Sequence, residues 1–137
     1  MPTPSEELQK AIYDALLADE AVTAIVGNRV HDGLTAGATF PLVTFGPSDY
    51  VPDDMDCITG REETVQLDCW VRDGVRLRGA KALADAVKAA LHLRELDLGA
   101  HALAELAVES VRAFMDPDNL TAHGVVTVTA LIEERDG

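Results

Sequence analysis

Two cysteines and four histidines are the side chains with which this chain could bind a transition metal or carry out nucleophilic chemistry. Cys57 and Cys69 stand twelve residues apart instead of forming a Cys-x-x-Cys pair, and no histidine follows at zinc-finger spacing. We expect one loop thiol and one core thiol. His123 with Asp118 is the one acid–base pair that we considered, and a turn histidine beside a carboxylate is usually structural. The sequence thus predicts no catalytic site and no transition-metal site.

Clusters of acidic residues raise the separate question of a calcium site. A calcium loop that began at Asp54 would need oxygen ligands at its fifth and twelfth positions, which are Ile58 and Val65. A loop that began at Asp116 fails at the same two positions. The glycines over 74–79 lack the Lys-Ser/Thr pair of a phosphate-binding loop. We therefore expect neither a calcium ion nor a nucleotide cofactor.

The charge of the chain restricts its partners. The 137 residues carry 11 basic and 24 acidic side chains, a formal net charge of -13. Stable binding to nucleic acid or to anionic lipid depends on basic residues, so both are disfavoured. The acidity either serves solubility or gives a surface that does not hold passing DNA, and composition alone does not separate the two. The first residues do not form a secretory signal, and no apolar run is long enough to span a membrane, so we expect synthesis in the cytoplasm.

Hydrophobic periodicity and turn residues predict the elements that must position any functional side chains. The expected elements are helices over 5–18 and 19–26, strands over 29–32 and 42–45, a long loop over 46–61, a strand over 62–72, a helix over 75–92, and strands over 96–98, 104–115 and 124–132.

Some of these elements are indicated more clearly by their residues than others. Residues 62–72 alternate between apolar and polar side chains, which is typical of a strand with one buried face. Residues 101–115 fit a helix or a strand, and we favour a strand because a strong turn over 116–119 and a β-branched run follow. The prediction is a single α+β domain over 1–137, with an antiparallel or mixed sheet, one long helix packed on a face and an N-terminal helical corner.

Several segments together resemble one protein family. They are LQKAIYDALLADEAVTAIVGNRVHDG (8–33), FPLVTFG (40–46), TGR (59–61), VQLDCWVRD (65–73), GAKALADAVKAALH (79–92), and DPDNLTAHGVVTVTALIE (116–133) preceded by Arg112. In this order the segments resemble the small tail completion, or tail terminator, proteins of long-tailed phages and of phage-like gene transfer agents. The resemblance covers nearly the whole chain.

The resemblance implies a structural function. Proteins of this family have a mixed sheet flanked by helices and form a homohexameric ring on the finished tail tube. The ring ends tube polymerisation, contacts the major tail tube protein and the neck or stopper protein, and lets DNA pass through its lumen. The resemblance implies no catalytic residue, no cofactor and no membrane contact. It places the protein at the tail–neck junction of a virion or phage-like particle made in a bacterial cytoplasm.

Candidate interface residues follow from residue type and from this resemblance. Aromatic side chains dominate interface hot spots, and arginines can pair with carboxylates across subunits. The candidates for contact with a neighbouring subunit or the tube are Tyr50, Asp53, Asp54, Asp56, Arg61, Trp70, Arg72, Arg112 and Asp116. Core packing of the aromatics, intrachain ion pairs, and a merely solvated loop are the competing interpretations.

Three other functions remain open from the sequence. One is a different neck component, such as a head–tail connector or stopper. Another is a host α+β module that binds a protein partner. The third is a small hydrolase whose site the motifs do not reveal.

Overall fold

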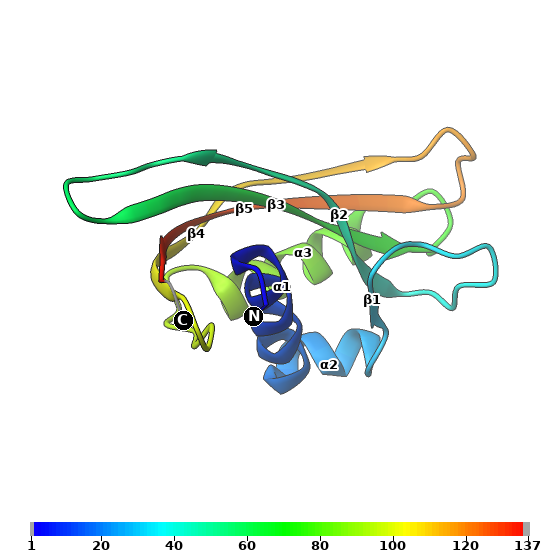
Figure 1. The fold of residues 1–137 in the computed structure, drawn as a ribbon. Helices are drawn as coiled ribbons and strands as arrows, with labels where there is room; N and C mark the ends of the chain where they lie inside the picture. Colours follow the sequence, from blue (N-terminus) through cyan, green and yellow to red (C-terminus); the bar gives the residue numbers. More distant parts are fainter. Residues whose placement is uncertain (1, 136–137) are drawn as a thin grey trace.

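Three helices lie against one face of a five-stranded sheet in the computed structural model, which describes residues 2–135 (Figure 1). In chain order the elements are α1 (Pro4–Ala18), α2 (Glu20–Val26), β1 (Val30–His31), β2 (Leu42–Pro52), β3 (Thr59–Val71), α3 (Arg78–Leu91), β4 (Ala102–Met115) and β5 (Ala122–Glu134). The strand order is β1-β2-β3-β5-β4, with β1 parallel to β2 and the other pairs antiparallel. The predicted α+β class and mixed sheet are confirmed.

A shared capping residue makes the corner between α1 and α2. The α1 helix begins with a capping box in which Thr3 and Glu6 bond to each other's backbone N–H. Asp19 ends α1 and accepts a hydrogen bond from the backbone N–H of Val22, so it also caps α2. Ser5, at the start of the predicted helix over 5–18, does not cap α1, and its hydroxyl donates to Glu63 on β3 at 2.9 Å.

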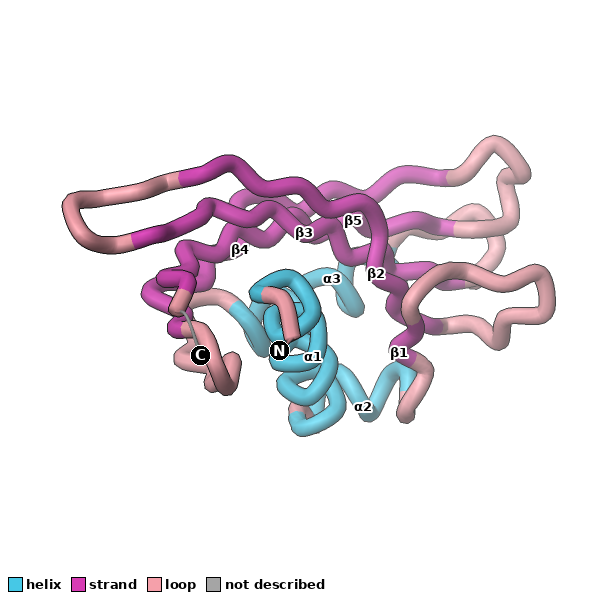
Figure 2. Tube along the Cα trace, viewed as in Figure 1, coloured by secondary structure: helices cyan, strands magenta, loops and turns pink. Residues whose placement is uncertain are grey.

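The prediction of a loop over 46–61 is wrong. β2 continues to Pro52 and β3 already begins at Thr59, so these residues form a long hairpin with loop only at its tip (Figure 2). A register shift between Phe45 and Ser48 accommodates Pro47, which has no N–H for the ladder. The far part of β2 lies beyond the helices and is exposed, so it lacks the apolar alternation of a half-buried strand.

The segment between α3 and β4 also differs from prediction. Residues 96–98 form no strand, although Leu98 is buried in the core. The Glu7 carboxylate of α1 accepts hydrogen bonds from the backbone N–H groups of Ala100 (2.8 Å) and His101 (3.0 Å). A side chain distant in sequence therefore satisfies the backbone N–H groups that directly precede β4. The predicted strand over 104–115 is confirmed by β4.

The core lies between the three helices and the sheet face that they cover. One stripe of α3 is buried, and its members are Ala80, Leu83, Ala84, Val87, Ala90 and Leu91. Gly124 of β5 lets α3 approach closely, because a Cβ there would lie 3.2 Å from the Cβ of Cys69 and 3.3 Å from the carbonyl oxygen of Ala80. Small aliphatic side chains thus set the spacing between helix and sheet.

Candidate functional site

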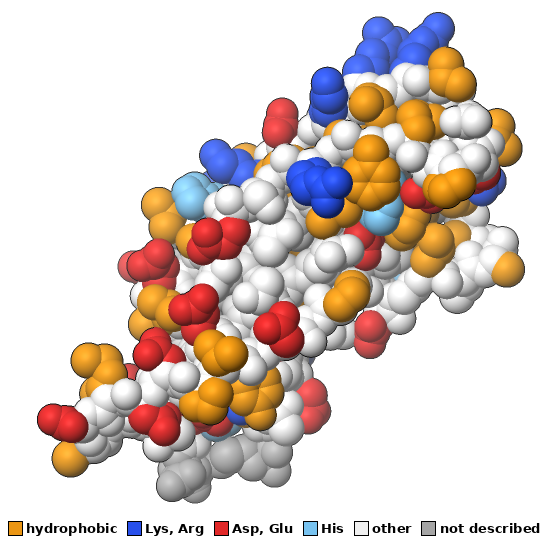
Figure 3. Space-filling model, turned by 90° about the horizontal axis from the view of Figure 1, so that it is seen from above, with side chains coloured by type: hydrophobic (Ala, Val, Ile, Leu, Met, Phe, Trp, Pro, Cys, Tyr) orange, Lys and Arg blue, Asp and Glu red, His pale blue; other side chains and the backbone are white. Residues whose placement is uncertain are grey.

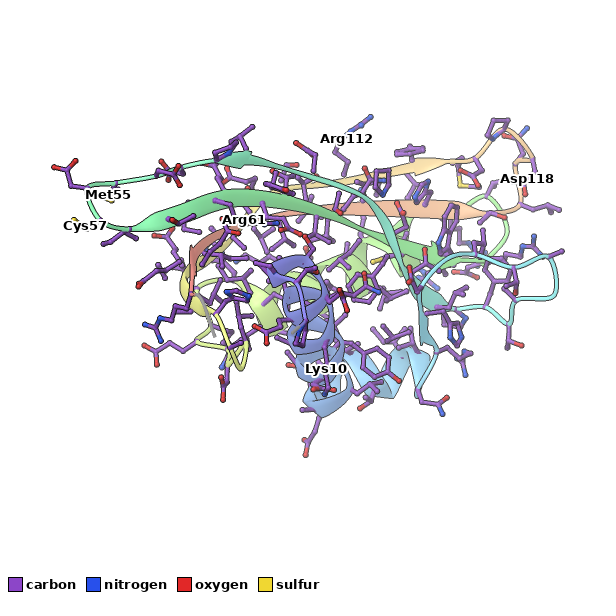
Figure 4. The ribbon with its side chains drawn as sticks, in the orientation of Figure 1. Lys10, Met55, Cys57, Arg61, Arg112 and Asp118 are labelled. Carbon is purple, nitrogen blue, oxygen red and sulfur yellow. The ribbon has the colours of Figure 1, made fainter. Side chains whose placement is uncertain are left out.

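The nine predicted interface residues fall at two opposite ends of the sheet. Five of them lie on the hairpin formed by β2 and β3, which we call the arm (residues 46–61). The other four lie where β3 ends and β5 begins, and they are Trp70, Arg72, Arg112 and Asp116. β3 runs from one end to the other over 13 residues, a length of about 40 Å at 3.3 Å per residue. Figure 4 shows Met55 and Cys57 at the tip of the arm and Asp118 at the far end.

The tip of the arm is ordered by its own hydrogen bonds. Met55 and Ile58 exchange two backbone hydrogen bonds of 2.9 Å around the turn at Asp56 and Cys57. The Asp54 carboxylate accepts a further bond from the backbone N–H of Gly60 at 3.0 Å. Met55 is 70% exposed and Ile58 43% exposed. The arm therefore presents apolar side chains on a preformed scaffold.

Arg61 anchors the base of the arm from within the same chain. Its guanidinium donates to Glu134 at 2.9 Å and to Glu63 at 3.3 Å, and it lies over the Tyr50 ring. Burial alone would lower the pKa of Arg61, but the hydrogen bond and charge of Glu134, with help from Glu63, raise it above its usual value. Of the competing interpretations, intrachain pairing thus describes the contacts that Arg61 makes here.

A stack of rings lies on the sheet face opposite the helices. Trp70 stacks on His123 with ring centroids 3.9 Å apart, and its indole N–H donates to Thr44 at 2.9 Å. His123 Nε2 lies 2.7 Å from Asp68 and its Nδ1 lies 3.5 Å from Asp116. Trp70 is thus covered by its own chain without being part of the helix-covered core.

His123 does not pair with Asp118, the candidate acid–base partner in the sequence. Asp118 instead accepts hydrogen bonds from the backbone N–H groups of Leu120 (2.8 Å) and Thr121 (3.0 Å). These bonds lower the pKa of Asp118 and fix the turn before β5. The Asp118 carboxylate therefore stabilises the turn, whereas His123 lies beside the carboxylates of Asp68 and Asp116.

Two arginines remain on the surface at this end of the sheet. Arg72 donates to the Thr121 hydroxyl at 3.2 Å and lies over Phe40. Arg112 lies over Phe114, with 5.3 Å from guanidinium carbon to ring centroid, and points away from the helices (Figure 4). It borders a hollow of about 280 Å³ between α3 and β4.

Charge is distributed unequally between the two ends. Exposed acids on the arm and its base are Asp49, Asp53, Asp54, Asp56 and Glu62. Exposed cations at the other end are Arg72, Arg76, Arg78, Lys81 and Arg112. Figure 3, which looks onto the uncovered sheet face, shows Lys and Arg gathered at one end and Asp and Glu predominating toward the other. The two ends differ in the sign of the charges they present.

Within residues 2–135, no group of three His, Cys, Asp or Glu side chains is arranged to hold a metal ion. None of the helices in the same range has the length and apolar character needed to cross a bilayer.

Comparison with known protein families shows to which family the chain belongs. Residues 10–133 match the family described as Tail completion protein gp17. The chain belongs to this family. It is accordingly a structural protein of phage-type tails, and the predicted resemblance is confirmed.

One solved structure extends the relationship between this gp17-family chain and tail proteins. The chain is similar to a chain in the virion of a native gene transfer agent particle, with 25% identity and a TM-score of 0.87. The match covers 97% of this chain and 99% of that one. A search of curated proteins gives no match.

Sequence reasoning about this gp17-family chain missed several surface residues. Met55 and Ile58 fall in the predicted loop over 46–61. Lys81 falls in the predicted helix over 75–92 and Val111 in the predicted strand over 104–115. For Met55 and Ile58 the sequence did carry a signal, because these apolar residues stand among aspartates. For Lys81 and Val111 there was no signal, because only the packing of α3 beside β4 brings them to one hollow.

Proposed function

We propose that this protein is a tail terminator that forms a homohexameric ring on the end of the tail tube. The ring stops tube polymerisation and joins the tube to the neck or stopper protein, while DNA passes through its lumen. The observation that carries the proposal is the match of residues 10–133 to a tail completion family, together with similarity over 97% of the chain to a virion protein.

The shape and charge of the subunit support closure into a ring. In a head-to-tail ring each subunit uses two different patches, one toward each neighbour. The acidic arm and the cationic end of the sheet are two such patches, and they lie at opposite ends of β3. Opposite charges favour this order over contacts between like ends.

The net charge of -13 supports passage of DNA through the ring. Phosphate groups bind where Lys and Arg displace their counterions, and an acidic lumen offers few such contacts. The DNA would therefore slide past without being held. No cofactor and no catalytic step are needed for this role, and the partners are proteins of the tail tube and neck.

Deletion of the gene tests the proposed function. We expect abnormally long tails that do not join heads, when seen by electron microscopy. Supplying the wild-type gene in trans should restore normal tails. Tails of normal length in the mutant, joined to heads as usual, would refute the terminator role. Tails of normal length that fail to join would instead indicate a stopper or connector.

A further inference from the structure

The outer edge of β2 is paired only at its start. β1 is two residues long, and the backbone N–H of Val43 on β2 donates across this edge to the Arg29 carbonyl oxygen at 3.0 Å. Alternate residues of a strand direct their N–H and C=O groups to the same side, and the β3 partners of Val43, Ser48 and Tyr50 are spaced by multiples of two residues. Ser48 and Tyr50 therefore direct their backbone groups outward as well. Both are exposed and pair with no strand on this side among the described residues, and we call them the open edge of β2.

The outer edge of β4 is closed over its first half and open over its second. The backbone N–H of Val108 donates to Nδ1 of His92, just after α3, at 3.0 Å. The β5 partners of Val108, Val111 and Ala113 are spaced by two residues, so all three direct their backbone groups away from β5. Within residues 2–135, no strand pairs with Val111 or Ala113 on that side, and no hydrogen bond from elsewhere reaches their backbone. These two residues form the open edge of β4.

The directions of the four long strands allow the two open edges to pair between copies of the chain. β2, β3, β5 and β4 are neighbours in this order and each is antiparallel to the next, so β4 runs opposite to β2. When copies are related by rotation about a ring axis, β2 of one copy therefore meets β4 of the next in antiparallel orientation. An unpaired edge is a template for another strand, and each open edge supplies the partner that the other lacks.

Side-chain charge selects one register for this pairing. If Ser48 lies opposite Ala113, the next pair is Asp49 and Arg112, and both of these side chains lie on the uncovered face of the sheet, where Figure 4 shows Arg112. Both are exposed, and neither forms an ion pair within residues 2–135. A shift of two residues in either direction places an uncharged side chain of β4 opposite Asp49. Opposite charges directly across an antiparallel pair favour the first register.

The lengthwise offset between the two open edges fits a closed ring. Pairing across the sheet places Ser48 level with Val128 of β5, whereas Ala113 is level with Gly124, four residues away. Joining the edges therefore shifts the sheet by about 13 Å along the strands for each subunit, across a width of about 19 Å for four strands. The strands then tilt by about 35° from the ring axis, which is the tilt usual in closed sheets.

We propose that β2 of one subunit pairs with β4 of a second copy of this chain, with Ser48 opposite Ala113 and Asp49 opposite Arg112. The inference rests on the ring proposed above and specifies its subunit contact. Backbone hydrogen bonds join the open edges, and the two charges set the register. Each contact leaves one free edge of β2 and one of β4, so repetition continues until the ring closes.

Paired cysteines test the register directly. Ser48→Cys with Ala113→Cys keeps both charges and places Cα atoms about 5.5 Å apart in the proposed pairing, a distance that a disulfide bridges. Cys57→Ser in the same chain removes the natural exposed thiol, and Cys69 is buried. After assembly on purified tail tubes, mild oxidation with copper phenanthroline should give a ladder of linked oligomers on non-reducing gels. Either new cysteine alone should give no ladder.

A matched control places the thiols two residues out of register. Ser48→Cys with Met115→Cys sets the Cα atoms about 7–8 Å apart, so its ladder should be at most about a tenth as strong. An equally strong ladder from this control would refute the register.

The outcomes separate the contact from the function. Rings seen on tubes by electron microscopy, but with no ladder from Ser48→Cys with Ala113→Cys, would overturn the edge pairing while leaving the terminator role intact. Disulfides formed only with the tube protein would assign the edge to that partner and also overturn the pairing. Tubes that bind no ring of wild-type protein would overturn the terminator role, and the pairing with it.

Charge exchange gives a second, independent test. Asp49→Arg or Arg112→Asp should lower the fraction of tubes that carry a ring at least about tenfold, because like charges then lie opposite each other at every contact. Both substitutions in one chain should restore rings. Glu62→Arg, an exposed change on the same sheet face but on β3, should leave ring formation unchanged. Failure of the double variant to recover, with circular dichroism showing it folded, would rule out the pairing of these charges.

Discussion

The guanidinium carbon of Arg61 lies 3.6 Å from the centroid of the Tyr50 ring, across the base of the arm. The same guanidinium bonds to Glu63 and to Glu134, so one side chain joins β2, β3 and β5. Arg61 is 8% exposed and Glu63 2% exposed, which makes this a buried charge cluster beneath a projecting hairpin. Charged side chains, and not apolar ones, therefore link the base of the arm to the rest of the sheet.

Replacement of this anchor should destabilise the fold strongly. We expect Arg61→Met to lower the free energy of unfolding by about 3–5 kcal/mol, because Glu63 is left buried without its cation. Urea denaturation followed by circular dichroism measures the change. Arg112→Ala is the matched control, since Arg112 is exposed, and it should change stability by less than about 0.5 kcal/mol. Equal stability of the two variants would show that the cluster contributes nothing.

Gly124 should tolerate no side chain without loss of stability. A Cβ there would lie 3.2 Å from the Cβ of Cys69 and 3.4 Å from that of Ala84, so α3 must shift away from β5. We expect Gly124→Val to cost about 1–3 kcal/mol, with a smaller cost for Gly124→Ala, in thermal or urea unfolding. Gly37→Ala is the control, because nothing lies within 4 Å of its added Cβ. A wild-type melting curve for Gly124→Val would mean that this helix–strand contact is loose.

The two thiols should react at very different rates. Burial, together with the charge of nearby Asp68, raises the pKa of Cys69 to about 12. At pH 8 only about one Cys69 in ten thousand is then a thiolate, and the side chain is inaccessible as well. An aromatic disulfide reagent should modify one thiol per native chain quickly, and the second only after unfolding. Cys57→Ser should remove the fast phase, and its persistence in that variant would contradict the assignment.

Acid should weaken the link between α1 and the segment before β4. Burial tends to raise the pKa of Glu7, but hydrogen bonds from Ala100 and His101 outweigh it and lower the pKa below its usual 4.5. A lowered pKa stabilises the fold above pH 4.5, and this stability is lost as the pH falls through the folded-state value.

Glu7→Gln should therefore reduce stability at pH 7 by about 1–3 kcal/mol, through loss of charge-assisted bonds. It should also flatten the dependence of stability on pH below 4.5, measured by urea unfolding at several pH values. Glu109→Gln on β4 is an exposed control and should leave both unchanged. A wild-type pH profile for Glu7→Gln would refute the linkage.

Local sequence patterns predicted most elements correctly but failed where the chain leaves the core. The alternation before Val71 and the β-branched run after Gly124 identified β3 and β5, because their inner faces are buried. The arm was mistaken for a loop because a hairpin that projects into solvent has no face to bury, while Pro47 and Pro52 resemble loop residues. The strand expected over 96–98 is absent because no neighbouring strand of the described chain pairs with these residues, and Glu7, far away in sequence, holds the following backbone at Ala100 and His101.

The sequence by itself determined the α+β class and the acidic character, since these follow from periodicity and composition. Its segments also carried the resemblance to the tail completion family that residues 10–133 match. Only the tertiary structure decided which of the candidate residues contact which other residues. It turned Arg61 inward to Glu134, placed Trp70 on His123, and brought Lys81 and Val111 to one hollow. The physical reason is that strand order and helix packing join residues dozens of positions apart, and no local pattern encodes those distances.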